Sequence, residues 1–364
     1  MPSHHILRSR IEGGILGLLV GDALGVPYEF NSPSNLPPLE AIEMTPPADF
    51  RRSHAGVLPG TWSDDGAQAL ALLASLLECD RLDLDDLARR LLAWRDHGAM
   101  TPDDRMFDIG VQTSAALSAL DRGTPAEQAG PSDARSNGNG SLMRVLPLAL
   151  WHRGSDEELA ADAMRQSLVT HGHIRSQLCC ALYVLWARAL MQMPGDTSVG
   201  KATGLDEGSK SDDATEREVW SHSADPIERD DLSPRDVTGV DDAWARAVAT
   251  LRALHAPGTV ARTELDTVID PDGEHRPGGS GYVVDALHSA RWAVAQGAYE
   301  SVVKRAVGLG HDTDTTACIA GGIAGVRDGV EAIPSRWLDA LRGMSLVRPL
   351  IDALVARHQP METS

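Results

Sequence analysis

The stretch that decides the fold is "GHDTDTTACIAGG", residues 310–322, in which two carboxylates and three hydroxyls precede small apolar residues. An Asp before a helix is an ordinary N-cap, and acidic residues there suit the helix dipole. Capping accounts for one carboxylate, but the stretch carries both Asp312 and Asp314. Hard cations such as Mg²⁺ and Mn²⁺ prefer several oxygen ligands. The stretch therefore predicts a helix over 315–327 that begins either at a simple cap or at a metal site.

A second stretch, "GTWSDDGAQ" at 60–68, repeats this arrangement. Ser63 is followed by Asp64 and Asp65 at the start of a strongly helical pattern, and capping by Ser63 is again the alternative. Two clusters of hydroxyls and acids, each opening an apolar helix, would supply the ligands of a two-cation site. So many acids are electrostatically unfavourable together unless cations compensate. We therefore hypothesise two divalent cations, Mg²⁺ or Mn²⁺, between these two helix starts.

The remaining chain reads as helix and loop, without convincing alternating strands. Periodic apolar positions predict helices over 11–26, 63–78, 83–98, 107–123, 156–170, 173–193, 241–255, 281–296, 298–308 and 335–357, and one more after the Gly-Asn turn near residue 140. Residues 31–60 read as loop. Residues 195–241 are rich in Asp, Glu, Ser and Gly, and predict a disordered acidic insertion. We expect one compact all-α domain over 10–357, interrupted by 195–241.

The composition narrows the classes of function. The 364 residues carry a formal net charge of −19, so a nucleic-acid-binding face is not expected. Four cysteines without a CxxC pair argue against a disulfide framework or a zinc site and fit a reducing cytoplasm. No run reaches the ~20 apolar residues that a membrane span needs. We expect a cytoplasmic monomer that acts on a protein or a small molecule.

Two shorter motifs carry further acids. "GDALGVPYEF" at 21–30 contributes Asp22, which could cap a helix or hydrogen-bond locally, and Glu29, which could be an exposed acid in a turn. "FDIG" contributes Asp108, placed just inside a helix start, where capping is the alternative to a catalytic role.

Two other motifs carry polar or glycine-rich turns. "SNGNGSLMR" at 136–144 predicts a backbone turn that could receive an anion, because glycines allow close approach and a following helix start presents free N–H groups. "THGH" at 170–173 is compatible with a core or capping histidine as well as with a ligand-binding one.

Taken in order, these motifs resemble those of the ADP-ribosylglycohydrolases. The resemblance runs from "GLLVGDALGVPYEF" through "GTWSDDGAQ", "FDIGVQT", "GNGSLMRVLPLA", "THGH" and "GSGYVVDAL" to "GHDTDTTACIAGGIAG", and covers roughly residues 10 to 345 apart from the acidic insertion. It implies a compact all-α fold with a binuclear Mg²⁺ or Mn²⁺ centre. It also implies hydrolysis of the glycosidic bond between ADP-ribose and an acceptor, with an arginine-type protein linkage favoured.

The resemblance assigns roles residue by residue. The implied metal ligands are Ser63, Asp64, Asp65, Asp312, Asp314 and Thr315. Asp108 or Glu29 would activate water or protonate the leaving group, and the sequence does not choose between them. Asn139, Gly140, Ser141 and Met143 match the turn near the ADP-ribose phosphates, and His171 and Tyr282 match positions that line the nucleotide pocket.

Three departures from the family pattern leave the substrate open. Ser63 stands where Thr is usual, Gly66 replaces a common Thr, and His311 stands where a small residue is frequent. A non-catalytic relative that binds ADP-ribose, a hydrolase of a free ADP-ribose derivative and a metal-dependent phosphohydrolase are the alternatives. The intact acids argue against the first, and the ordered motifs argue against the last.

Overall fold

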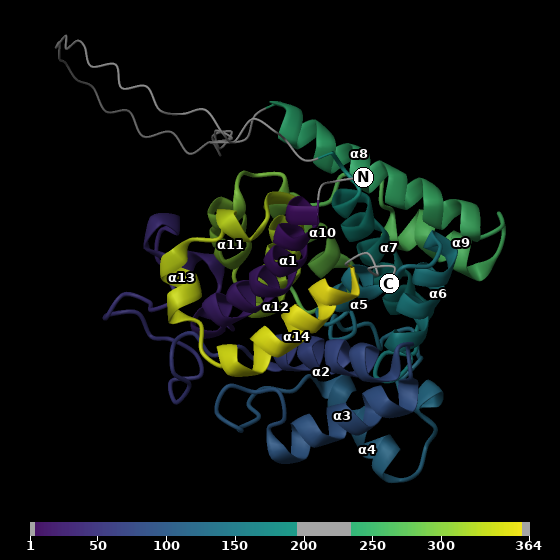
Figure 1. Ribbon diagram of the computed structural model, residues 1–364, viewed down its shortest axis with the longest axis horizontal. Helices are drawn as coiled ribbons and strands as arrows, with labels where there is room; N and C mark the ends of the chain where they lie inside the picture. Colours follow the sequence, from purple (N-terminus) through teal and green to yellow (C-terminus); the bar gives the residue numbers. More distant parts are fainter. Residues whose placement is uncertain (1–3, 195–233, 359–364) are drawn as a thin grey trace, which may run out of the picture.

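The computed structural model describes residues 4–194 and 234–358, and every regular element within these ranges is helical (Figure 1). The all-α prediction is confirmed. The only extended pairing in these ranges is an isolated antiparallel bridge between Gly138 and Tyr282. The α-helices are α1(His4–Gly25), α2(Asp64–Cys79), α3(Leu84–His97), α4(Val111–Asp121), α5(Leu146–Trp151), α6(Asp156–Ser167), α7(Ile174–Met191), α8(Pro234–Leu254), α9(Val260–Glu264), α10(Val283–Val294), α11(Tyr299–Gly308), α12(Thr313–Asp328), α13(Ser335–Ala340) and α14(Met344–Arg357).

The centre of the fold is an antiparallel pair formed by α1 and α12. Glycines recur every four residues along α1, at 13, 17, 21 and 25, and each faces the backbone of α12. A Cβ atom at Gly21 would lie 2.1 Å from the carbonyl oxygen of Ala317, and one at Gly325 would lie 1.9 Å from that of Gly13. Atoms cannot approach so closely, so only glycine permits this helix spacing.

Helix α1 is a core element. The segment His4–Tyr28 is long and apolar enough to cross a membrane by length and composition, but the whole of its apolar window is buried inside the protein. Its apolar side chains join the single hydrophobic core that α2, α7, α10 and α12 also enter. The burial accounts for the apolar composition of the helix without a membrane.

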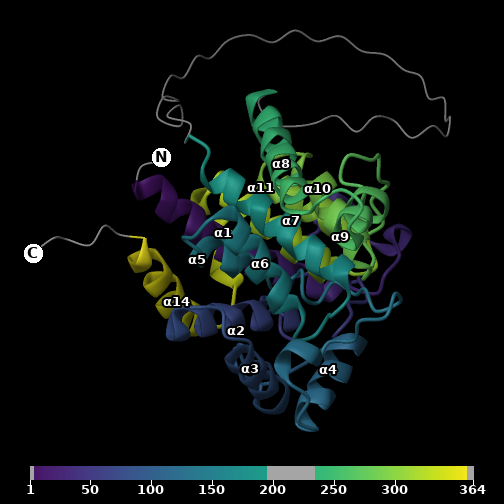
Figure 2. The same ribbon diagram turned by 90° about the vertical axis from the view of Figure 1, so that its right-hand side faces the viewer.

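The other helices surround this pair. The helices α2, α3 and α4 lie together at one end of the molecule, with α14 beside α2, and α8 lies at the opposite end (Figures 1 and 2). Local capping fixes several of these helices: α6 begins with a capping box formed by Ser155 and Glu158, and α3 ends at Gly98 in the left-handed conformation.

Several predicted boundaries need correction. The region 335–357 forms two helices, because Gly343 adopts a left-handed φ of 72° between α13 and α14. The helix predicted from 107 begins only at Val111. Helix α8 begins at Pro234, so residues 234–241 of the predicted insertion are helical, and residues 195–233 lie outside the described part. Proline at the first position of α8 is a helix-start signal that the acidic composition concealed. The π-helical turn η5(Leu265–Ile269) and α9 before it were not predicted.

Candidate active site and metal centre

Three helix ends meet at the candidate site. The last turns of α1, which carry Asp22 and Gly25, lie against the first turns of α2 and α12. A Cβ at Gly25 would be 2.4 Å from the Cα of Asp314, and the hydroxyl of Thr313 donates a 2.8 Å hydrogen bond to the Gly25 carbonyl. The close α1–α12 contact therefore brings the start of α12 to the end of α1. Two helix N-termini point their partial positive charge into the same region.

Asp22 ties α1 to α2. Its carboxylate accepts from the Ser63 backbone N–H at 2.9 and 3.1 Å, and from the Gly66 N–H at 2.7 Å. These are N–H groups at the start of α2 that a helix cannot satisfy internally. Asp22 is fully buried, and burial raises its pKa to about 7. The role is capping, as one interpretation of the sequence allowed, but across 41 residues rather than locally.

Asp65 brings the two predicted clusters together. Its Oδ2 accepts from the hydroxyl of Ser63 at 3.1 Å and from that of Thr315 at 3.4 Å, so groups from α2 and α12 share one oxygen. Its other oxygen, Oδ1, is buried and has no hydrogen-bond partner in the described residues. A buried carboxylate oxygen without a partner is energetically unfavourable, and a bound cation would supply the missing partner.

A second group of acids lies beside this one. Oxygens of Glu29, Asp312 and Asp314 lie within 4.8 Å of one another. Asp312 occupies the N-cap position of α12 but makes no side-chain capping bond; instead it accepts a 2.8 Å hydrogen bond from the Asn139 side chain. Simple capping therefore does not explain Asp312. Ser63 does cap α2, by accepting a 3.3 Å bond from the Asp65 N–H, so both interpretations of Ser63 remain compatible with its position.

Burial and mutual repulsion disfavour the charged forms of these acids. Burial is the first cause that raises the pKa values of Asp64, Asp65 and Asp314 well above the ordinary range, and the neighbouring carboxylates add to it. Burial, followed by the charges of Asp108 and other acids, raises the pKa of Glu29 to about 11. Divalent cations would reverse this balance. The oxygen-rich donor set and the unpartnered Asp65 oxygen fit hard cations such as Mg²⁺ or Mn²⁺.

Asp108 does not cap a helix. The N-cap of α4 is Gly110, with no side-chain capping bond, and Asp108 lies before it with a left-handed φ of 56°. The half-buried side chain faces Glu29 and His54, since ligand atoms of these three residues lie within 4.8 Å of one another. His54 also makes a 2.7 Å hydrogen bond to Glu29 Oε2. The capping alternative for Asp108 is therefore wrong.

A cavity of about 320 Å³ opens over the acids. It is lined by Glu29, Phe30, Asp64, Asp108, Gly110, Val111, Gln112, Thr113, Gly138, Asn139, Gly140, Met143, His171, Gly281, Asp312 and Thr315. Most of the predicted residues are thus brought to one place. Asp65 and Asp314 are buried at its base beside their neighbours.

Two predicted substrate residues do not line this cavity. Ser141 is fully buried behind the wall, where its hydroxyl oxygen lies 2.8 Å from that of Ser167. Tyr282 is 38% exposed and lies beside the lining residue Gly281, with the Arg175 guanidinium 5.8 Å from its ring centre.

The turn at 136–144 is more internally bonded than predicted. The N–H groups of Leu142 and Met143 bond the Asn139 carbonyl, the Asn139 N–H bonds Gly281, and the Gly138 N–H bonds Gln112. Helix α5 begins only at Leu146. The free N–H groups expected at a helix start are therefore largely used within the protein.

An apolar rim borders the cavity. Phe30 is 70% exposed and Val111 is 87% exposed, and both line the opening. Phe30 has a left-handed φ of 60°, which is unfavourable for a bulky residue, and His311 opposite has 62°. Two hydrogen bonds hold this arrangement: the Phe30 N–H donates to the His311 carbonyl at 2.6 Å, and the His311 N–H donates to Asn31 at 2.7 Å. Such strain is typical of functional segments.

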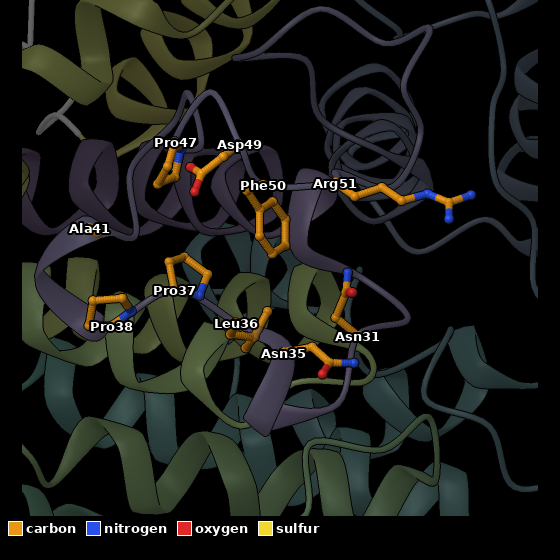
Figure 3. A pocket seen from close by; sticks show the side chains of 10 residues that line it. All are labelled: Asn31, Asn35, Leu36, Pro37, Pro38, Ala41, Pro47, Asp49, Phe50 and Arg51. Atoms are coloured by element: carbon orange, nitrogen blue, oxygen red, sulfur yellow. The ribbon is translucent and has the colours of Figure 1, made fainter.

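A second, larger cavity of about 640 Å³ is lined by residues between positions 31 and 51 (Figure 3). Its lining includes three prolines, the side chain of Phe50, one carboxylate, Asp49, and one cation, Arg51. None of the predicted site residues lines it. The concentration of acids, and with it the candidate chemistry, belongs to the smaller cavity.

Sequence reasoning did not identify three polar residues around the site. His54 bonds Glu29, and Gln68 donates a 3.2 Å hydrogen bond to Asp64. Arg144 is fully buried and bonds Gln68. A signal for Arg144 was present, because it is the one charged residue in the apolar run "SLMRVLPLAL" at 141–150.

Comparison with known proteins finds a matching family, related sequences and a similar solved structure. Residues 3–363 match the sequence pattern of the family described as ADP-ribosylglycohydrolase. The ADP-ribosylarginine hydrolase Tri1 of Serratia proteamaculans is 28% identical over 347 residues, which cover 95% of this chain and 78% of that protein. The ADP-ribosyl-[dinitrogen reductase] glycohydrolase of Rhodospirillum rubrum is 26% identical, with 98% and 97% covered. A solved ADP-ribosylglycohydrolase-related protein complex superposes with a TM-score of 0.67 at 27% identity, covering 97% and 99%.

Proposed function

The chain belongs to the ADP-ribosylglycohydrolase family, and from this premise we propose that it is a metal-dependent hydrolase that releases ADP-ribose from modified arginine side chains. The observation that carries the proposal is the convergence of seven carboxylates from three helix ends and two loops: four line one cavity and the other three are buried close to them. These are Asp22, Glu29, Asp64, Asp65, Asp108, Asp312 and Asp314. Apart from Asp22, which caps α2, a purely structural relative would gain nothing from keeping so many acids together, most of them buried.

We assign the residues of the site to two roles, metal binding and proton transfer. Ser63, Asp64, Asp65, Asp312, Asp314 and Thr315 would hold two divalent cations, with Glu29 beside them. When bound, such cations orient hydroxyl groups and an attacking water and stabilise developing negative charge. A carboxylate committed to a cation stays ionised and cannot easily carry a proton, so a separate acid is needed.

Asp108 fits the reacting role best. It lines the cavity and no hydrogen bond is recorded for its carboxylate among the described residues, whereas Glu29 is engaged by His54. Cleavage at the anomeric carbon needs a base for the water or an acid for the leaving group. Asp108 is placed to serve either end of this transfer. Thr113 and Gln112 line the same cavity.

The arginine linkage is supported by charge and by the rim. An acidic cavity favours a cationic acceptor over a neutral one. The exposed ring of Phe30 could additionally stack on a guanidinium, which is a favourable cation–π partner. The relative Tri1 is named an ADP-ribosylarginine hydrolase.

The product distinguishes the proposal from its alternatives. Purified protein with Mg²⁺ is incubated with ADP-ribosylarginine, ADP-ribosylserine and O-acetyl-ADP-ribose, and the products are separated by chromatography. We expect free ADP-ribose, formed fastest from ADP-ribosylarginine. AMP would indicate a phosphohydrolase, and binding without any product would indicate a non-catalytic relative.

Replacing Asp314 should remove cation binding while keeping the fold. Asp314→Ala removes a buried carboxylate that has the Glu29 and Asp312 oxygens within 4.8 Å, and isothermal titration should show fewer bound Mg²⁺ or Mn²⁺ ions. Circular dichroism should be unchanged. The exposed Asp339 on α13 provides the control Asp339→Ala, which should bind as the wild type does. An unaltered ion count in Asp314→Ala would refute the ligand assignment.

Phe30 should contribute to binding of the arginine acceptor and not to binding of the ADP-ribose part of the substrate. Phe30→Ala is expected to raise KM for ADP-ribosylarginine about two- to five-fold, which corresponds to the ~0.5–1 kcal/mol of an exposed cation–π contact. Affinity for ADP-ribose alone should not change. Phe30→Tyr keeps the ring and should behave as the wild type. Equal effects of Phe30→Ala on arginine- and serine-linked substrates would show that the ring does not recognise the cation.

A further inference from the structure

A buried guanidinium lies behind the cavity wall. Arg144 is fully buried, and no carboxylate pairs with it among the described residues. It instead donates to Gln166 Oε1 and to the Gln166 carbonyl, both at 3.0 Å, to Gln68 Oε1 at 3.1 Å, to Thr170 Oγ1 at 2.7 Å and to the Gly140 carbonyl at 3.3 Å. Because a guanidinium has only donors in a fixed planar array, each neighbour must present an acceptor to it.

This constraint determines where the Thr170 hydroxyl points. Thr170 Oγ1 accepts from Arg144 and lies 2.8 Å from Nδ1 of His171. Thr170 is fully buried, and no other acceptor for its hydroxyl hydrogen is recorded in the described part of the chain. If Nδ1 carried a proton, the buried hydroxyl hydrogen would have no acceptor, which is unfavourable. The hydroxyl therefore donates to Nδ1, and the ring proton resides on Nε2.

The other ring nitrogen faces the cavity. His171 lines the cavity, and Nε2 has no recorded partner in residues 4–194 and 234–358. Space around it is kept by two glycines: a Cβ at Gly138 would lie 3.3 Å from Nε2, and one at Gly140 would lie 2.9 Å from the adjacent Cε1. The backbone of His171 is also fixed, because its N–H donates to the Ser167 carbonyl and its carbonyl accepts from the Ser167 hydroxyl.

We propose that Arg144, acting through Thr170, fixes His171 as the tautomer with its proton on Nε2, so that the ring offers a hydrogen-bond donor to the ligand in the cavity. The inference rests on the proposed function in taking ADP-ribose as that ligand. Arg144 and Thr170 are positioning residues, since neither lines the cavity. Burial, with the Arg144 charge second, lowers the pKa of His171 to about 3, so the ring is neutral near pH 7 and its tautomer decides whether it donates or accepts.

The same guanidinium orients a second group. Gln68 Oε1 accepts from Arg144, so the amide must direct its NH₂ group to Asp64 Oδ2, 3.2 Å away. The single buried guanidinium thus orients two hydrogen-bond donors. One is Nε2 of His171, which faces the cavity, and the other is the Gln68 amide, which faces the proposed metal ligand Asp64. Removing Arg144 would leave several buried acceptors without partners, and such a variant is expected to unfold. The test is therefore placed on Thr170.

The tautomer can be measured directly. The protein is labelled with ¹⁵N-histidine, and His171 is assigned by the resonances that vanish in His171→Gln. In the wild type we expect a protonated, pyrrole-type Nε2 and an unprotonated, pyridine-type Nδ1. Thr170→Val removes the hydroxyl at almost constant volume and should change the Nδ1 signal or produce a tautomer mixture. Thr170→Ser keeps the hydroxyl and should restore the wild-type signals.

Affinity provides the second measurement. ADP-ribose binding in the presence of Mg²⁺ should weaken about ten-fold in Thr170→Val, as loss of one hydrogen bond predicts, and should recover in Thr170→Ser. A merely structural role of Thr170 would lower stability in both variants without moving the ¹⁵N signals. A wild-type ring protonated on Nδ1, or unchanged signals in Thr170→Val, would overturn the inference.

The two proposals fail separately. The apo-protein tautomer is measured without any ligand, so an Nε2-protonated ring that depends on the Thr170 hydroxyl supports the inference even if ADP-ribosylarginine is not hydrolysed. Absence of hydrolysis in the wild type would count against the proposed function. An Nδ1-protonated ring in an active enzyme would count against the inference alone.

Discussion

Asp108→Asn is expected to reduce turnover of ADP-ribosylarginine by about 10²- to 10⁴-fold, the usual contribution of general acid–base catalysis. Asparagine has nearly the shape of aspartate and tolerates the left-handed backbone at this position, φ 56°, so the loop should keep its conformation. The thermal midpoint and the affinity for ADP-ribose should be close to those of the wild type. Steady-state kinetics should show the loss in kcat.

The same loop supplies a control. Asp104 also has a left-handed φ, 53°, is exposed and does not line the cavity. Asp104→Asn should therefore retain the wild-type rate. If Asp108→Asn also hydrolyses substrate at that rate, the proton carrier is another group. Glu29 would then be tested as Glu29→Gln, with cation binding measured in parallel because Glu29 lies close to the proposed ligands.

Gly21→Ala is expected to lower the free energy of unfolding by about 3 kcal/mol, at the upper end of overpacking effects. The new Cβ would lie 2.1 Å from the Ala317 carbonyl oxygen and 2.6 Å from its carbon. Both atoms belong to the backbone of α12 and cannot rotate away, so the helices must separate. Alanine would otherwise favour the helix by about 0.5–1 kcal/mol. Urea denaturation monitored by circular dichroism measures the balance.

Gly14→Ala is the matched control on the same helix. A Cβ there would meet side-chain atoms, Val326 Cγ2 at 2.8 Å and Leu150 Cδ1 at 3.1 Å, which can shift. We expect little change in stability, because the helical gain offsets the crowding. If both variants unfold at the same urea concentration, the close backbone approach does not determine the spacing of α1 and α12.

The sequence predicted the helical class, and most residues that it proposed for the site line one cavity, because helix starts and turns depend on local patterns. The acids at 64–65 and 312–314 lie at the starts of strongly periodic helices, and α12 begins at Thr313, two residues before the predicted start. The same local reasoning placed Asp108 inside a helix. It failed there because the left-handed backbone before Gly110 ends any helical continuation, and no propensity of "FDIG" indicates that conformation.

Other features could not be read from the chain because they depend on tertiary contacts. The Asp22 carboxylate caps a helix that begins more than 40 residues later, and Arg144 acts through residues 76 and 26 positions away. Side-chain hydrogen bonds across such separations leave no periodic trace. The close approach of α1 and α12 was not predicted either, because the glycines of α1 reveal their partner surface only once the two helices lie together.

The pairing of α1 with α12 also determines when the centre of the fold can form during synthesis. The two helices are joined by contacts such as that between Thr313 and Gly25, 288 residues apart in the chain. During synthesis α1 emerges early, and its glycine-lined apolar face has no partner until α12 follows. Contacts at such separation form late and slowly. The apolar face of α1 therefore stays uncovered in the nascent chain until α12 has been made, and the acids of the proposed metal site can come together and bind cations only after that point.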